Sequence, residues 1–282
     1  MKTMIRAVVS LFVLFSILVP VTPVALAEKG KEKEEQPDKQ EQVEKEPIAV
    51  PNSVVNLAKE NTYPNPTQDL PYLQPSELTK ELINSSNEQI TNPRFIRMLN
   101  ESNVNKTPFA IGLRATIYLG DWALSYESKE TSPNWEFQQI NTNQVDNRGG
   151  KTAKQTIYTQ EVQKRITGSF TSKVKYGQDV RQMMLLSATE DTQLPLSFDT
   201  IIGAGTKGRQ TYSIPPKRLG YLYAYAPVVN EKGTVTYGEV YVVLKGHRRS
   251  IVVKNVTRQG VSAYIPVQDH VTFGFVTSER PR

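Results

Sequence analysis

The chain has very few residues that could act as catalytic or metal-binding groups. Among its 282 residues it contains no cysteine and two histidines, His247 and His270. The lack of thiols excludes disulfides, cysteine nucleophiles and Cys-ligated zinc, and two histidines cannot form a His-rich zinc site. Asp269 precedes His270, but adjacent residues on a strand point to opposite faces. We therefore expect no metal, no cofactor and no catalytic histidine.

Two further patterns point only weakly to chemistry. The segment GAGTKG (203–208) lacks the G-x-x-x-x-G-K-[ST] spacing of a phosphate-binding loop, so we interpret it as a turn between strands and expect no nucleotide. Paired carboxylates can hydrolyse glycosides, but acids are common on surfaces and sequence spacing does not give their separation. An envelope glycan hydrolase is therefore an alternative, and a protein without enzymatic activity is favoured. The candidate acids are Asp121, Glu127, Glu136, Glu161 and Asp199.

A row of tyrosines and a group of basic residues are the candidates for a binding surface. Tyr221, Tyr223 and Tyr225 alternate with Leu and Ala, so on a strand they share one face. If that face is exposed, the rings would stack on sugars or lie at a membrane interface; if it is buried, they would pack across strands. Tyr237 and Tyr241 are expected to continue the row after a turn at 231–233. The basic group comprises Lys245, Arg248, Arg249, Lys254 and Arg258.

The N-terminus has the features of a secretory signal peptide. Lys2 and Arg6 precede an apolar run, and Ala25-Leu26-Ala27 forms a small-x-small cleavage site. The organisation we expect is a signal peptide over 1–27, a charged disordered spacer over 28–50 and a single, mostly-β folded body over 51–282. The mature protein would then be secreted or associated with the cell envelope, outside the cytoplasmic membrane. Retention of the signal as an anchor is the alternative.

Positive charge is concentrated in the expected folded body. The spacer carries five Lys against eight acidic residues, whereas the body carries 27 Lys and Arg against 20 Asp and Glu. This moderate excess lacks the dense clustering of a nucleic-acid-binding protein. Outside the membrane, the abundant polyanions are cell-wall polymers and lipid headgroups. We therefore expect an anionic cell-wall polymer or a lipid headgroup surface as the partner; the sequence does not indicate an oligomeric state.

Short helices are expected before and within a strand-rich body. Ser76 can cap a helix over 77–83, Asn92-Pro93 starts a second, and 178–189 forms the central one. From residue 109 onward, β-branched and aromatic residues alternate with turn signals every eight to twelve residues. The fold class expected is α+β, mainly β, with an antiparallel sheet or sandwich and a few short N-terminal and central helices.

One long amphipathic segment suggests a different function. Over 156–176, six apolar or aromatic residues from Tyr158 to Tyr176 fall on even positions, and the nine odd positions from Thr159 to Lys175 are polar or charged, which predicts a strand. Together with TYSIPP (211–216), this segment is similar to parts of aerolysin-type toxins. A membrane-acting protein of the β-pore-forming kind is therefore the second interpretation, beside a protein that binds or organises an envelope component.

Several short motifs resemble one known family. The chain is similar to the YfkD-like family of exported Bacillus-type proteins over nearly the whole body, from about residue 51 onward. The resemblance implies an exported, single-family body and supplies no catalytic residues. It rests on NLAKENTYPNPTQDLP (56–71), LQPSELTKELI (73–83), MLNES (98–102), ATIYLG (115–120), DNRGG (146–150), GAGTK (203–207) and QDHVTF (268–273).

Overall fold

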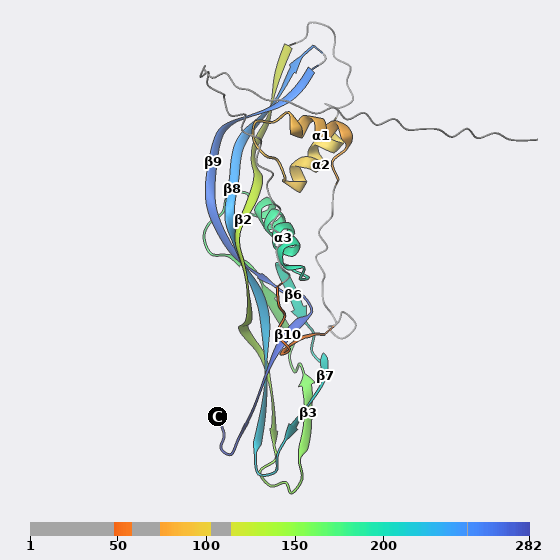
Figure 1. Ribbon diagram of the computed structural model, residues 1–282, viewed down its shortest axis with the longest axis vertical. Helices are drawn as coiled ribbons and strands as arrows, with labels where there is room; N and C mark the ends of the chain where they lie inside the picture. Colours follow the sequence, from red (N-terminus) through yellow and green to blue (C-terminus); the bar gives the residue numbers. More distant parts are fainter. Residues whose placement is uncertain (1–47, 58–73, 103–113, 247) are drawn as a thin grey trace, which may run out of the picture. The chain divides into compact units, whose positions relative to one another are not determined.

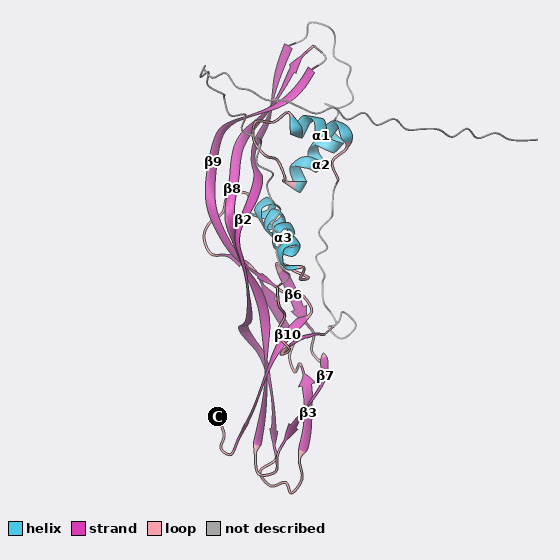
Figure 2. Ribbon diagram, viewed as in Figure 1, coloured by secondary structure: helices cyan, strands magenta, loops and turns pink. Residues whose placement is uncertain are grey.

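The computed structural model describes residues 48–57, 74–102, 114–246 and 248–282. The expected signal peptide over 1–27, the spacer up to residue 47 and His247 lie outside these residues. The described part is antiparallel and mainly β, as the sequence predicts (Figure 2).

Three long antiparallel strands form the frame of the protein (Figure 1). They are β2 (Arg114–Asp146), β8 (Leu219–Lys245) and β9 (Arg248–Pro266). β8 pairs with β2 over its whole length; on its other side it pairs first with β10 (His270–Ser278) and then with β9. The smaller strands are β1 (Val54–Asn56) on β10, β5 (Ser169–Phe170) on β9, β3 (Lys154–Thr159) with β7 (Lys207–Ile214), and β4 (Lys164–Thr167) with β6 (Asp199–Ile202).

The three expected helices are confirmed, and they lie along one face of the long sheet (Figure 1). They are α1 (Glu77–Asn84), α2 (Pro93–Glu101) and α3 (Gly177–Thr192). The Ser76 hydroxyl accepts a hydrogen bond from the Thr79 amide, and the Asn92 side chain accepts from the amides of Arg94 and Phe95. Both caps satisfy amide groups that a helix leaves without intrahelical partners.

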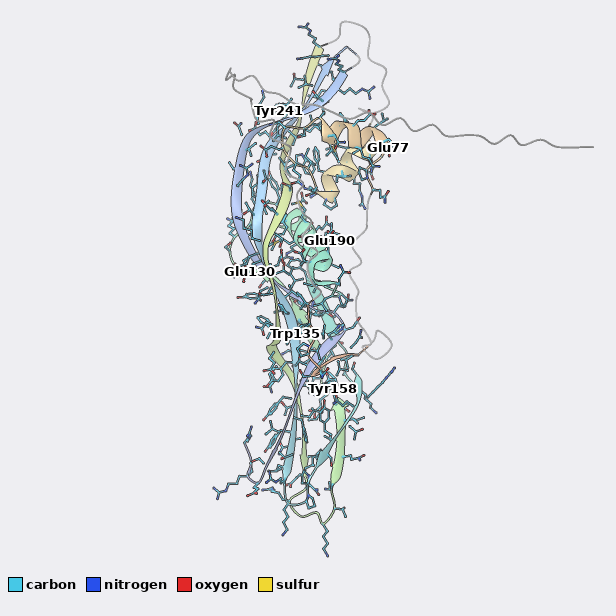
Figure 3. The ribbon with its side chains drawn as sticks, viewed as in Figure 1. Glu77, Glu130, Trp135, Tyr158, Glu190 and Tyr241 are labelled. Atoms are coloured by element: carbon cyan, nitrogen blue, oxygen red, sulfur yellow. The ribbon has the colours of Figure 1, made fainter. Side chains whose placement is uncertain are left out.

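The core consists of three apolar clusters that follow one another along the sheet. At one end, Phe95 and Leu99 of α2 pack on Val240 and Val242. α3 covers the middle of the sheet, and β3 and β7 cover the other end, where the ring centroids of the fully buried Tyr158 and of Phe273 lie 4.9 Å apart. Figure 3 shows Tyr241 near the first end and Tyr158 toward the second. We call these the upper and lower ends of the sheet.

The turn expected at 231–233 is wrong, because β8 runs unbroken through these residues. Gly233 lies in the ladder opposite Ser128, where a Cβ atom would come 2.2 Å from the carbonyl oxygen of Glu127. Glycine is therefore present for close strand approach and not for a turn. β2 is likewise continuous from Arg114 to Asp146, and its pairing with β8 contains five register shifts.

The single strand expected over 156–176 is also wrong. Its residues form β3, β4 and β5, which pair with β7, β6 and β9 respectively. The strand is interrupted at Gly168, between β4 and β5. A Cβ atom there would lie 2.6 Å from the carbonyl oxygen of Tyr264. Tyr158 and Ile166 are buried and Phe170 is partly buried, each on a different piece, whereas Val162 between β3 and β4 is 73% exposed.

Residues 85–92 form a strap that joins the two outer edges of the sheet. On β9, Ser85 accepts from the Ile251 amide, and the Asn87 side chain bonds both the amide and the carbonyl of Val253. On β2, the Asn92 side-chain amide donates to the Ala123 carbonyl at 2.6 Å. The strap thus occupies edge groups that would otherwise be free to pair with another chain.

Candidate functional site

Three basic side chains stand side by side at the upper end of the sheet. Arg114 of β2 lies directly opposite Lys245 of β8, and Lys245 lies opposite Arg248 of β9. Residues directly opposite in antiparallel strands share a face, with Cα atoms about 4.5–5.5 Å apart. All three are exposed, and the ion pairs between described residues lie elsewhere. We call Arg114, Lys245 and Arg248 the basic row.

In the strand segments that carry the basic row, the sequence supplies no negative charge. Segments 114–118 and 241–252, which form this end of the sheet, contain four basic and no acidic residues. Like charges placed directly across strands destabilise a sheet. A shallow depression of about 280 Å³ lies between β2 and β8 beside Arg114 and Lys245. The arrangement therefore favours an anionic partner that approaches the end of the sheet.

A pair of tyrosines lies on the same face as the basic row, four residues further along β2 and β8. Tyr118 is directly opposite Tyr241, and their ring centroids are 5.1 Å apart. The Tyr118 side chain is 55% exposed. The Lys254 ammonium lies 5.0 Å from the centre of the Tyr241 ring, a cation–π contact. At about 3.3 Å per residue, the tyrosine pair lies about 13 Å from the basic row.

On the face of the basic row, in the described parts of β2, β8 and β9, the first acidic residues lie just beyond the tyrosine pair, and both have partners. The Tyr241 hydroxyl donates to Glu239 at 2.8 Å. Hydrogen bonds from Asn255 and Tyr241 lower the pKa of Glu239. On the same face, Asp121 forms an ion pair with Lys175. These carboxylates are thus held within the sheet and do not compensate the basic row.

The structure divides the basic group predicted from the sequence. Lys245 and Arg248 join the basic row, but Arg249 is opposite Leu244 and so lies on the other face. Lys254 lies over Tyr241, and Arg258 pairs with Glu88 at 3.3 Å. These residues therefore do not form one continuous basic surface.

The tyrosine row predicted from the sequence lies far from the basic row. Tyr221, Tyr223 and Tyr225 belong to the lower end of β8, at least 20 residues from Lys245, which is about 65 Å along a strand. Tyr221 is buried and stacks on the half-buried Tyr223 at 6.2 Å, while the Leu222 side chain enters the core. Tyr237, expected to extend the row, lies in the central core instead.

The candidate acids are scattered over the sheet. Asp121 pairs with Lys175 and Asp199 with Arg165. The structure brings two other carboxylates together: the Thr131 hydroxyl lies 2.6 Å from Glu231 and 3.2 Å from Asp191. Glu231 is fully buried and also accepts from Tyr126, so a substrate does not reach it.

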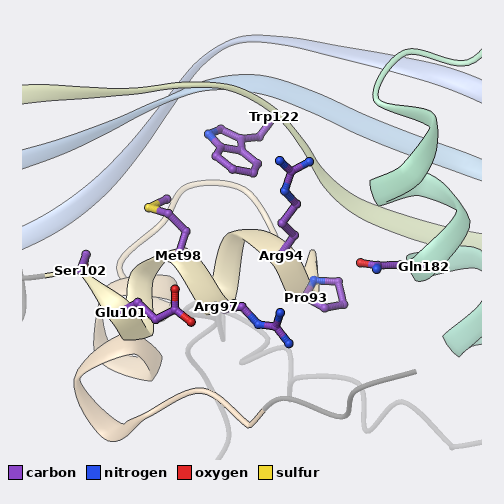
Figure 4. Close-up of a pocket in the computed structure, with 8 residues that line it drawn as sticks. All are labelled: Pro93, Arg94, Arg97, Met98, Glu101, Ser102, Trp122 and Gln182. Carbon is purple, nitrogen blue, oxygen red and sulfur yellow. The ribbon is translucent and has the colours of Figure 1, made fainter. Parts of the chain in front are cut away.

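A larger concavity lies between α2, β2 and α3 (Figure 4). Its volume is about 620 Å³, and it is lined by Trp122, Met98 and the arginines Arg94 and Arg97. The Arg94 guanidinium is tied to the buried Asp179 at 3.3 Å, and Trp122 packs edge-on against Phe95 at 5.0 Å. Its walls therefore belong largely to the packing of α2 against the sheet.

Arg114 and Tyr118 were not found from the sequence. Both depend on the register of β2 against β8, which brings together residues more than 120 positions apart. Within the described ranges, no group of three His, Cys, Asp or Glu residues could hold a metal ion. Among those same residues, no helix is both long and apolar enough to span a bilayer.

Comparisons with known proteins identify relatives of the chain. The family model described as YfkD-like protein matches residues 51–282. A Bacillus subtilis (strain 168) protein, "Uncharacterized protein YfkD", is 60% identical over 238 residues, which cover 84% of this chain and 90% of that protein. The crystal structure of Lamprey immune protein is 6% identical in sequence. The match covers 59% of this chain and 54% of that protein's chain, with a TM-score of 0.26. A TM-score this low does not establish a shared fold.

Proposed function

The chain belongs to the YfkD-like protein family, and we propose that it is an exported protein that attaches to anionic lipid headgroups of the cell envelope through its basic row. The observation that carries the proposal is the alignment of Arg114, Lys245 and Arg248 across three strands. Arginine binds phosphate in a bidentate manner, and lysine binds it as a point charge. Phosphate groups under the row would replace its mutual repulsion with attraction.

Exposed apolar groups favour a lipid surface over a cell-wall polymer. Tyr118 is 55% exposed, and the neighbouring Ile117 is 39% exposed. Adjacent residues on a strand point to opposite faces, so both sides of β2 present an apolar group within four residues of the basic row. Tyrosine rings are well placed at the headgroup level of a bilayer, whereas a hydrated polyanion offers such groups no apolar environment.

The attachment is reversible. Each basic residue near an anionic membrane contributes about 1 kcal/mol, so the row supplies about 3 kcal/mol. Screening limits this attraction to a Debye length of about 10 Å at 0.1 M salt. The protein would therefore leave the membrane as the salt concentration rises.

Export is part of the proposal and has its own test. The Ala25-Leu26-Ala27 site predicts a mature N-terminus at Glu28. N-terminal sequencing of protein recovered from outside the cytoplasm should give Glu28. An intact Met1 on that protein would show that the segment is retained as an anchor.

Vesicle binding tests the attachment. The mature protein should sediment at low salt with phosphatidylcholine vesicles that contain phosphatidylglycerol, and stay in solution with phosphatidylcholine alone. Molar salt should release it. Binding to a soluble polyphosphate combined with no binding to the anionic vesicles would refute the lipid assignment.

A further inference from the structure

A second concentration of basic residues lies at the lower end of the sheet. The register of the strands brings segments 146–154, 214–219 and 278–282 together there, since Leu219 is opposite both Asp146 and Ser278, and Lys154 is opposite Ile214. These segments contain seven basic and two acidic residues. Like the basic row, this end therefore carries a local excess of positive charge.

Both acidic residues at the lower end already have basic partners. Asp146 pairs with Arg148 at 2.7 Å, and hydrogen bonds from Arg148 lower the pKa of Asp146 to about 2. Glu279 pairs with Arg218 at 3.3 Å. Five basic side chains remain after these two pairs, and all of them are exposed. We call them the lower basic set: Lys151, Lys154, Lys217, Arg280 and Arg282.

The two basic ends are far apart along the sheet. They lie at opposite ends of β8, 26 residues apart, which is on the order of 80 Å along the strand. This separation is several times the Debye length of about 10 Å, so each end interacts with its own surroundings. The pairing of β8 with β2 along its whole length holds the two ends apart.

The lower end differs from the upper end in its apolar character. The large exposed apolar residues in the described part of the chain include Ile117 and Tyr118 at the upper end and none in the three lower segments. The nearest tyrosine, Tyr221, is buried, and its hydroxyl accepts from the Arg282 amide. Binding to a bilayer interface increases with the apolar area that is buried, so a surface that is charged but not apolar suits a hydrated polyanion better.

We infer that the lower basic set is a second anion site that takes a phosphate-bearing polymer, so that one molecule bridges a lipid surface and an anionic wall polymer. The inference rests on the proposed attachment of the basic row to lipid. Binding at two separate sites would make retention stronger than either end provides alone.

A capture experiment tests the bridge. Phosphatidylglycerol-containing vesicles carrying a lipid dye are passed over immobilised polyphosphate with the full mature chain. The wild type should hold the vesicles on the surface. The variant Lys151→Gln/Lys217→Gln/Arg280→Gln should sediment with vesicles as the wild type does, but capture them at least tenfold less. The matched control Lys129→Gln/Lys173→Gln/Arg209→Gln loses the same charge from exposed residues that belong to neither the basic row nor the lower basic set, and it should capture normally.

The outcomes separate the two claims. If the wild type does not sediment with anionic vesicles, the lipid attachment itself fails. If it sediments but captures no vesicles, or if the lower-end variant captures them as well as the control does, the bridge is refuted while the attachment stands. Clustering of vesicles in free solution as strong as their capture on polyphosphate would refute the polymer assignment of the lower end.

Discussion

Replacing Asn92 should show how strongly the strap is bound to the sheet. This fully buried residue performs two tasks. Its Oδ1 atom caps α2 by accepting from Arg94 and Phe95, at 2.9 and 3.2 Å. Its Nδ2 atom donates to the Ala123 carbonyl at 2.6 Å and to Asp179 at 3.2 Å.

The structure gives a magnitude for each task. Loss of an N-cap oxygen costs about 1 kcal/mol. Loss of the amide donor leaves buried acceptors one partner short, which costs about 1–3 kcal/mol. We expect Asn92→Ala to lower the free energy of unfolding by about 3 kcal/mol, which for a body of this size lowers Tm by about 6–12 °C. Asn92→Ser keeps a capping oxygen and should recover about 1 kcal/mol of that loss.

Urea unfolding followed by tryptophan fluorescence measures both variants. The midpoint should fall in the order wild type, Ser, Ala at an unchanged m-value. Equal midpoints for Ser and Ala would show that the cap contributes nothing. An Ala variant within about 0.5 kcal/mol of the wild type, the usual range of surface substitutions, would refute the strap's role in stability.

Two further predictions concern the ladder and the lower end. Gly233→Ala should destabilise the protein by about 1–3 kcal/mol, because the new Cβ overpacks against Glu127. Gly149→Ala should not destabilise it, because no atom lies within 4 Å of the new Cβ. Equal effects of the two substitutions on thermal unfolding would contradict the argument that Gly233 is needed for close strand approach. An NMR titration should give Asp146 a pKa of about 2, raised toward the ordinary value in Arg148→Gln. Because this pKa is lowered by folding, the stabilisation is present above the unfolded carboxyl's pKa and is lost as pH falls through about 2; an unchanged pKa in the variant would refute the pairing.

Local signals in the sequence predicted the helices and the class of fold. Ser76 and Asn92 are caps whose action depends only on residues within one turn, so their role is readable from the sequence. The antiparallel character followed from alternation and frequent turn residues. Gly233 misled the prediction because the same residue type permits a turn or a close approach of strands, and only the partner strand decides between them.

The candidate site was predictable only in part. Lys245 and Arg248 flank one hairpin, so their proximity is local. Arg114 joins them through pairing across the whole length of β8, and five register shifts in β2 set that alignment. Arg249 differs from Arg248 by one position, which on a strand moves it to the opposite face. Composition reveals the charge of such a group, whereas register determines which charges act together.

The affinity of the basic row for an anionic bilayer tests the central claim most directly. The dissociation constant for phosphatidylglycerol-containing vesicles should be measured at low salt for the wild type, for Arg114→Gln/Lys245→Gln/Arg248→Gln and for the equally charged control Lys129→Gln/Lys173→Gln/Arg209→Gln. We predict that the row variant binds about 100-fold more weakly, because three contributions of about 1 kcal/mol are lost, while the control stays within about threefold of the wild type. Equal weakening in the two variants would show that general charge, and not the basic row, holds the protein at the membrane, and would contradict the account.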